Sequence, residues 1–251
     1  MRAARSAGTE SGQAAVEAAL TLPLTVFLVL GTIQLFLLLQ ARLLTEYAAF
    51  RAVRTGVVKY GDCEPMTHAA IGALLPAITR TDSAAALGGA FNARRDNTYK
   101  PQRDAGHSGS IVWLARERPR LQDIPPDEEE SFDDPARYQQ LSDVMRLETR
   151  LVFWYPMRIP FANWVLSRMF LAHLGLQNYT AVNPLQPTQT ANWTRRTDFS
   201  LEAAIRQELL DRVGRKEYVF PLQASYTMRM MTPARPRFFQ VQNCPPTPEG
   251  L

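Results

Sequence analysis

A stretch of 24 residues without a charge runs from Ala18 to Ala41, close to the N-terminus of this 251-residue chain. A helix needs about 20 apolar residues to cross the hydrocarbon core of a bilayer. A cleavable secretory signal has a shorter apolar region, roughly 7–15 residues, and then a small-residue cleavage site that is not found after this stretch. A buried core helix is the alternative, but so long an uncharged run leaves no face for solvent. The stretch therefore predicts a retained membrane helix.

Helical character continues beyond the uncharged stretch, because the residues from Leu43 to Arg54 include neither glycine nor proline. Gly56 and Gly61 then supply stop signals. A helix from about Gln13 to about Val58 would be roughly 68 Å long, more than twice the membrane core, so its outer half is a stalk or packs under a domain. Basic residues flank both ends of the apolar run, so the positive-inside rule does not fix its orientation. One face of the outer half carries four residues at helical spacing: Leu43, Tyr47, Phe50 and Arg54.

Two residues at the start of the apolar run need an explanation. A carboxylate such as Glu17 costs about 2–3 kcal/mol at bilayer depth and less near the interface, so it either has a function or lies in the headgroup layer. Pro23 removes a backbone donor and is expected to kink or loosen the first turns, unless it is simply a tolerated membrane proline.

These residues form a recognisable pattern. The segment Ser11–Glu17, followed by an apolar helix that contains Pro23, resembles the class III leader of type IV pilins and is most similar to TadE-like proteins of the tight-adherence (Tad) pilus. Tyr47–Arg54 resembles a second family stretch, and Leu147–Pro156 and Leu222–Met230 are similar to two later strands of the family. The leader positions that agree with the family are Gly12, Val16, Glu17, Ala18, Leu20 and Pro23.

The resemblance implies a role for each leader residue. A prepilin peptidase would cut after Gly12, where the missing Cβ suits an extended strand in a tight cleft, and Gln13 would become the new N-terminus. Glu17 would then pair with the free amine of a neighbouring subunit, which stabilises a carboxylate in apolar surroundings. Pro23 would let the helix bend or melt locally during extraction from the membrane. The chain after the helix is longer than in many relatives, which favours a minor pilin or pseudopilin over a major one.

The same resemblance implies partners and a location. The partners are a prepilin peptidase, other Tad pilins and pseudopilins, the inner-membrane assembly platform and the lipid bilayer. The chain would be a single-pass protein of the bacterial inner membrane, with a cytoplasmic N-terminus and a periplasmic C-terminal domain, or would enter an extracellular pilus. The net charge of +4, from 28 basic and 24 acidic residues, is too small to indicate nucleic acid. Two alternatives remain open: an inner-membrane protein with a periplasmic binding or scaffolding domain outside any fibre, and an anchored enzyme.

The expected organisation is a leader (1–12), a transmembrane and stalk helix (13–60) and an exported domain (61–251). Hydrophobic patterning predicts that this domain is α+β, with an antiparallel sheet and packed helices. The resemblance to pilins implies a pilin-like arrangement of these elements. The predicted strands are 111–116, a half-buried strand at 147–155, and 218–231 interrupted by Pro221. The predicted helices are 67–75 stopped by Pro76, a weak segment at 83–91, and 199–213 with Asp198 or Ser200 as its cap and Gly214 after its end. Segments 92–109 and 121–134 are expected to be loops, and 138–145 a helical turn.

The apolar segment Phe161–Leu174 has two interpretations. Its apolar face, which includes Trp164 and Phe170, favours packing in the core. Lying on the membrane or binding a partner helix is the alternative, although the two basic residues Arg158 and Arg168 are few for a membrane surface helix.

The chain has two cysteines, Cys63 and Cys244, so one intramolecular disulfide is possible in an oxidising compartment. Closing a loop of about 180 residues would contribute on the order of 5 kcal/mol in the chain-entropy model. The alternative is two thiols too far apart to bond.

Signals for catalysis or metal binding are weak. Gly106–Ser110 misses the G-x-S-x-G pattern because its last position is serine, and the acidic run Asp127–Glu130 lacks the spacing of an EF-hand. The histidines His68, His107 and His173 are scattered. The sequence therefore predicts no catalytic residue, no cofactor and no metal ligand, which favours a structural protein over an enzyme.

Overall fold

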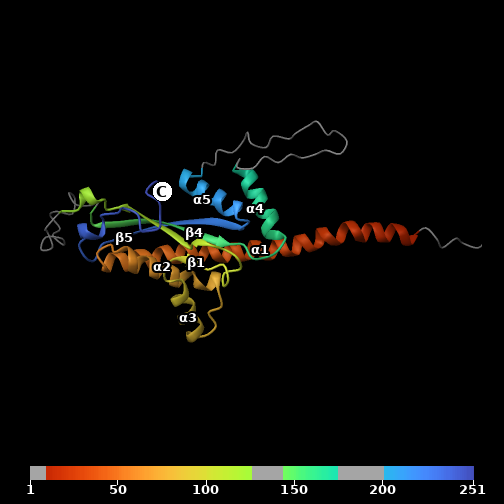
Figure 1. The fold of residues 1–251 in the computed structure, drawn as a ribbon, viewed down its shortest axis with the longest axis horizontal. Coiled ribbons are helices and arrows are strands. Elements are labelled where there is room, and N and C mark those ends of the chain that lie inside the picture. The colour runs from red at the N-terminus through yellow and green to blue at the C-terminus, as the bar shows by residue number, and fades with distance from the viewer. Residues whose placement is uncertain (1–9, 126–143, 175–200) are drawn as a thin grey trace, which may run out of the picture.

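The computed structural model describes residues 10–125, 144–174 and 201–251. Helix α1 (Glu10–Val58) lies along one side of a globular part and projects far beyond it toward the N-terminus (Figure 1). At 1.5 Å per residue its 49 residues span about 73 Å. The remaining helices and strands are α2 (Cys63–Ile78), α3 (Ala84–Arg94), β1 (Thr98–Tyr99), β2 (Gly109–Ser110), β3 (Val112–Arg118), β4 (Arg146–Pro156), α4 (Ala162–His173), α5 (Ala203–Gly214) and β5 (Val219–Arg229), with short 3₁₀ turns at Leu121–Asp123 and Pro236–Phe238.

The main sheet is antiparallel with the order β3-β4-β5, and β1 and β2 form a separate two-stranded ribbon. In the central register Leu151 of β4 faces Leu114 of β3 and Ala224 of β5. The predicted α+β class with an antiparallel sheet is therefore confirmed. The predicted interruption at Pro221 is wrong, because β5 is an edge strand and a proline is tolerated where one side of the strand is unpaired.

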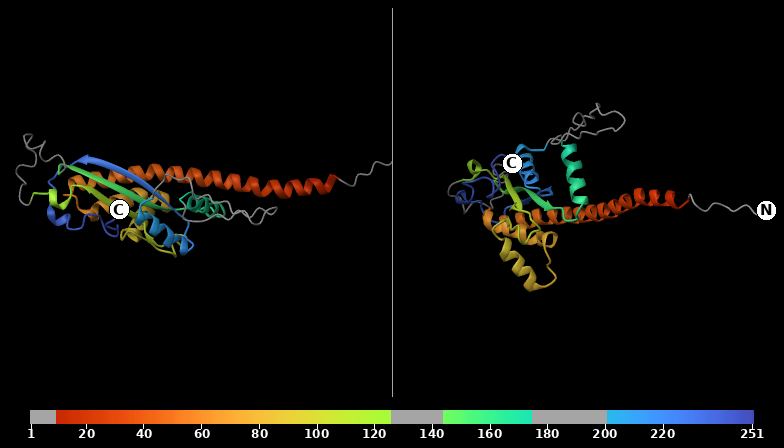
Figure 2. Two further views of the ribbon diagram at one scale, coloured as in Figure 1. Left: turned by 90° about the horizontal axis from the view of Figure 1, so that it is seen from above. Right: turned by 45° about the vertical axis from the view of Figure 1, so that its right-hand side comes forward.

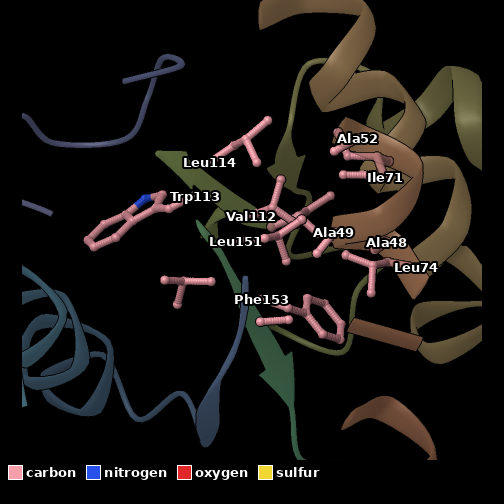
Figure 3. Close-up of a cluster of buried hydrophobic side chains, with 14 of the residues drawn as sticks. Ala48, Ala49, Ala52, Ile71, Leu74, Val112, Trp113, Leu114, Leu151 and Phe153 are labelled. Carbon is pink, nitrogen blue, oxygen red and sulfur yellow. The ribbon is translucent and has the colours of Figure 1, made fainter. Parts of the chain in front are cut away.

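The core lies between the sheet and the pair α1 and α2. Val112, Leu151 and Phe153 point from the sheet toward Ala48 and Ala49 of α1 (Figure 3), and the side chains of all five are fully buried. Small alanine side chains let the helix approach the strands closely, which gives the stretch Tyr47–Arg54 a packing role. The face of α1 that carries Leu43 and Tyr47 points away from the core, and these side chains are 61% and 47% exposed.

The other face of the sheet is also covered, which corrects one prediction. Trp113 points away from α1 in Figure 3, and its ring packs edge-on against Trp154 at 4.9 Å. The guanidinium of Arg212 from α5 lies 4.8 Å from the centre of the Trp154 ring. The predicted half-buried strand is therefore wrong for the second half of β4, where 151–156 are buried on both faces. The alternate residues from Leu147 to Tyr155 are buried as predicted.

Several predicted helix boundaries also shift. α2 continues through Pro76 to Ile78, because losing one hydrogen bond near a helix end costs less than burying Leu75 and Ile78 provides. α3 extends past Phe91, and Gly214 is the last residue of α5 rather than following it. The residue before α5 is Glu202, which makes no side-chain capping bond. The predicted caps Asp198 and Ser200, the acidic run and most of segment 138–145 lie outside the described residues.

Gly56 has a different role from the predicted stop signal. It lies inside α1, and a Cβ there would be 2.6 Å from both Leu147 Cδ2 and Met66 Sδ, so the glycine permits close packing. The helix ends two residues later at Val58, as predicted. Gly61 adopts a φ of +81° in the turn that leads to α2, which suits its predicted role as a breaker.

The C-terminal tail is fastened to the start of α2 and to the edge of β3. Cys63 and Cys244 form a disulfide that closes a sequence separation of 181 residues. The backbone N–H of Cys244 also donates to Leu114 O at 2.9 Å, beside the outer edge of the sheet. The tail is thereby held against both the helical layer and the sheet.

Arg116 provides a second fastening for the tail. It is 1% exposed, and its guanidinium donates to the carbonyl oxygens of Gly61 (2.6 Å), Phe238 (2.8 Å) and Gln242 (2.9 Å). The same group lies 4.1 Å from the centre of the Phe239 ring. Burial lowers the pKa of Arg116 to about 10, so the side chain stays charged at neutral pH. One buried cation therefore joins the end of α1, β3 and the tail.

Candidate assembly site on the N-terminal helix

The N-terminal part of α1 projects beyond the globular part (Figure 1). Residues 14–26, hereafter the free arm, are all exposed, and from Phe27 onward one face of the helix is covered by the globular part. The exposed large apolar side chains of the free arm are Val16, Leu20, Leu22, Leu24 and Val26, which are 46–72% exposed. So large an apolar surface is unfavourable in water and marks a site that lipid or other chains cover.

One helix among the described residues is long and apolar enough to cross a membrane, and it is α1 over Ala14–Val58. Only 6% of its most apolar window is buried, so the alternative of a core helix does not fit. The chain therefore has one apolar N-terminal helix compatible with single-pass membrane anchoring.

The residues expected to take part in processing and assembly lie on or next to the free arm. Gly12 lies in the first turns of α1, and a Cβ there would meet no atom within 4 Å. Gln13 and Glu17 are four positions apart in α1, about one helical turn. The Glu17 side chain is exposed on the arm. Gly12 and residues 14–26 are all exposed.

Pro23 lies in the middle of the free arm, and α1 continues through it without a break. On either side, the hydroxyls of Thr21 and Thr25 donate to the carbonyl oxygens of Glu17 (2.8 Å) and Thr21 (2.9 Å). These bonds satisfy the threonine hydroxyls within the helix, which suits an apolar environment. Apart from Glu17, the arm therefore presents an almost entirely apolar surface.

Sequence reasoning gave no role to Gln34, although a polar residue inside an uncharged run is itself a signal. Gln34 is fully buried, and its Oε1 accepts a hydrogen bond from the backbone N–H of Ile159 at 2.9 Å. Nearby, the rings of Phe27 and Phe161 pack edge-on at 5.7 Å. These two contacts join the apolar run of α1 to the segment that leads into α4.

The described residues do not assemble a site for catalysis or metal binding. A shallow charged groove lies over β3 and β4, but Arg150 in it pairs with Glu117 at 3.3 Å and with Glu202. In the near-miss segment Gly106–Ser110, the hydroxyl of Ser108 donates to Glu217. No group of three or more His, Cys, Asp or Glu residues that could hold a metal is found in the described part of the chain. These polar groups serve the structure of the domain.

The fold and the free arm define a chain with one membrane-compatible helix followed by an α+β domain. Its N-terminal part, residues 12–54, matches the family model described as TadE-like protein. The match confirms the resemblance of residues 12–54 to TadE-like proteins. It covers the free arm and the buried half of α1, and ends before the sheet domain begins. No curated protein and no solved structure matches the chain.

Proposed function

We propose that the chain is a minor pilin or pseudopilin of a Tad pilus, cleaved by a prepilin peptidase between Gly12 and Gln13. Residues 1–12 are the leader, 13–60 the transmembrane and stalk helix, and 61–251 the exported domain. The observation that carries the proposal is the free arm. It presents the exposed Glu17 and an exposed apolar surface next to the exposed Gly12, within a segment that matches TadE-like proteins.

Glu17 is the residue that makes assembly directional. Its carboxylate is costly in lipid unless a cation lies close by. After cleavage, the new amine of Gln13 on a neighbouring subunit supplies such a cation at the same level of the membrane. A helix entering an assembly is then held in register by this pair, while the surrounding apolar side chains pack on neighbouring helices.

The Cys63–Cys244 disulfide supports an exported position for the α+β domain, since disulfides persist in the bacterial periplasm and are rare in the cytosol. The chain is then anchored in the inner membrane with a cytoplasmic N-terminus. Its partners are the prepilin peptidase, the other Tad pilins and pseudopilins and the assembly platform. α4 projects sideways from α1 next to the free arm, which supports a minor or initiating subunit rather than a repeating one (Figure 1).

The test compares Glu17→Gln with Glu46→Gln in cells that assemble the pilus. Glu46 is a matched control, because it is an exposed carboxylate on the same helix. It forms an ion pair with Arg42 at 3.0 Å. We expect Glu17→Gln to remain in the membrane but to lose cross-links to other pilus subunits, while Glu46→Gln keeps them. Equal cross-linking by both variants would favour the alternative, an inner-membrane protein whose domain binds or scaffolds outside a fibre.

A further inference from the structure

Helix α4 begins beside α1, at the point where the free arm meets the globular part. Figure 1 and the right-hand view of Figure 2 show α4 standing crosswise to the long axis of α1. Two contacts hold the start of α4 against α1: the Phe27–Phe161 ring contact at 5.7 Å and the Ile159–Gln34 hydrogen bond at 2.9 Å. If α1 crosses a bilayer along its axis, α4 therefore runs nearly parallel to the membrane plane.

The position of these contacts along α1 sets the depth of α4. Phe27 lies about 15 Å along the helix from Glu17, and Gln34 about 26 Å from it. The hydrocarbon core is about 30 Å thick, so both contacts lie within it when Glu17 is at its boundary. Keeping α4 outside the bilayer would leave only Ala18–Val26 as the uncharged span, about 14 Å, which is half the core. Moving the span toward the N-terminus would instead carry Glu17 to mid-membrane, where a carboxylate is costly.

The surface of α4 suits this depth. Its buried side, which includes Ser167 and Leu171, packs on the domain, and Phe170 contacts Phe220 of β5 at 4.3 Å between ring centres. Large apolar side chains are exposed at the start of α4 and on its side away from the domain. They are Phe161 (53% exposed) and Trp164 (44%) at the start, and Met169 (57%) on the far side. Exposed aromatic residues on a helix parallel to the membrane are typical of helices buried at the boundary of headgroups and acyl chains.

The backbone is strained at Phe161, whose ring contacts Phe27 of α1. Phe161 precedes α4 with a φ of +67°, in the left-handed region that a bulky side chain rarely adopts and that costs on the order of 1–3 kcal/mol. In this conformation its ring packs on Phe27, and Trp164 stacks on it with 6.5 Å between ring centres. An aromatic cluster thus joins α4 to the membrane helix at the level of the apolar run.

We propose that α4 is a second membrane element, embedded in the leaflet on the side of the α+β domain, with lipid covering its exposed face. The interpretation of Phe161–Leu174 as a core-packing helix is then incomplete, because one side packs on the domain and the other contacts lipid. The proposal requires that α1 crosses a bilayer but does not depend on cleavage at Gly12 or on a pilus. Its consequence is that the domain is held at a fixed depth and tilt, rather than swinging on a stalk.

The test places a fluorophore on α4 of the full chain in vesicles of phosphatidylethanolamine and phosphatidylglycerol. Met169→Cys provides the label position, since the two native cysteines are bonded to each other. Val241→Cys is the matched control, an apolar residue 47% exposed in the C-terminal tail. We expect lipids with a nitroxide in the upper acyl chain to quench the label at 169 several-fold more than the label at 241. Equal, weak quenching at both positions would overturn the proposal.

A second label position guards against misfolding. Trp164→Cys is a second exposed position, nearer the start of α4, and should also be quenched by the nitroxide lipids, and an intact Cys63–Cys244 disulfide in each variant serves as the folding check. If the label at 169 is shielded from aqueous iodide in native membranes but is not quenched by nitroxide lipids in vesicles, another protein covers α4. That result would also overturn the proposal.

Discussion

The ring of Phe161 meets the ring of Phe27 edge-on, with 5.7 Å between the ring centres and planes at 90°. This contact joins the connection after β4 to the first turn of α1 after the free arm. It therefore determines how much of α1 is free to lie in a membrane or against neighbouring helices. The coupling energy between the two rings can be separated from their other contacts by a double-mutant cycle.

A double-mutant cycle tests the aromatic contact. Edge-to-face pairs contribute about 0.5–1.5 kcal/mol beyond their buried area, so Phe27→Ala and Phe161→Ala should be coupled by about that amount. The measurement is the free energy of unfolding of the full chain in detergent micelles. Leu28→Ala is the control, since Leu28 is the adjacent residue and is 63% exposed. Additive effects for the two phenylalanines would contradict the contact.

Two helical glycines should respond to alanine in opposite directions. Gly56→Ala places a Cβ 2.6 Å from Leu147 Cδ2 and Met66 Sδ, and we expect it to cost roughly 1–3 kcal/mol of stability. Gly72→Ala on α2 places a Cβ with no atom within 4 Å, and we expect a gain of about 0.5–1 kcal/mol from helix propensity. Thermal unfolding of both variants checks this, and a gain for Gly56→Ala would show that α1 does not approach β4 so closely.

Loss of the disulfide should destabilise the domain strongly. In the chain-entropy model, releasing a loop of 181 residues costs about 5 kcal/mol, so Cys63→Ala, Cys244→Ala and the double variant should all unfold at a similarly reduced denaturant concentration. A reducing agent should lower the wild-type midpoint to the same value and leave the double variant unchanged. A wild-type midpoint that does not respond to reduction would contradict this role.

Removing the buried guanidinium should release the tail. Arg116→Met leaves the carbonyl oxygens of Gly61, Phe238 and Gln242 without their donor, at about 1–3 kcal/mol for each buried group that stays unsatisfied. Arg206→Met on the exposed side of α5 is the control and should change stability little. Hydrogen exchange should show faster exchange at the Cys244 amide in Arg116→Met. Unchanged exchange there would show that Arg116 does not hold the tail.

Features with strong local signals could be predicted from the sequence. The uncharged run and the absence of helix breakers after it predicted α1. The alternation of apolar and more polar residues predicted β4 between Leu147 and Tyr155. Several of the predictions that failed rest on glycine and proline signals, which packing overrode. Gly56 fits against β4 instead of ending the helix, Pro76 stays in α2, and Pro221 is accommodated at a sheet edge.

The contacts that position α4 could not have been read from local patterns. Gln34 and Ile159, like Phe27 and Phe161, are distant in the sequence and meet only because the sheet folds back along α1. For the leader the opposite holds. Gly12, Glu17 and Pro23 were recognised through the resemblance to the class III leader, and the fold adds that all three are exposed on α1.

The most direct test of the account is the N-terminal mass of the protein from native membranes, with and without the prepilin peptidase. Gly12→Leu blocks the proposed cut, and Gly8→Leu is the control within the same leader. We predict that the wild type and Gly8→Leu begin at Gln13 when the peptidase is present, whereas Gly12→Leu and all peptidase-free samples begin at Met1 or Arg2. A wild-type protein that keeps its first twelve residues in the presence of the peptidase would contradict the account.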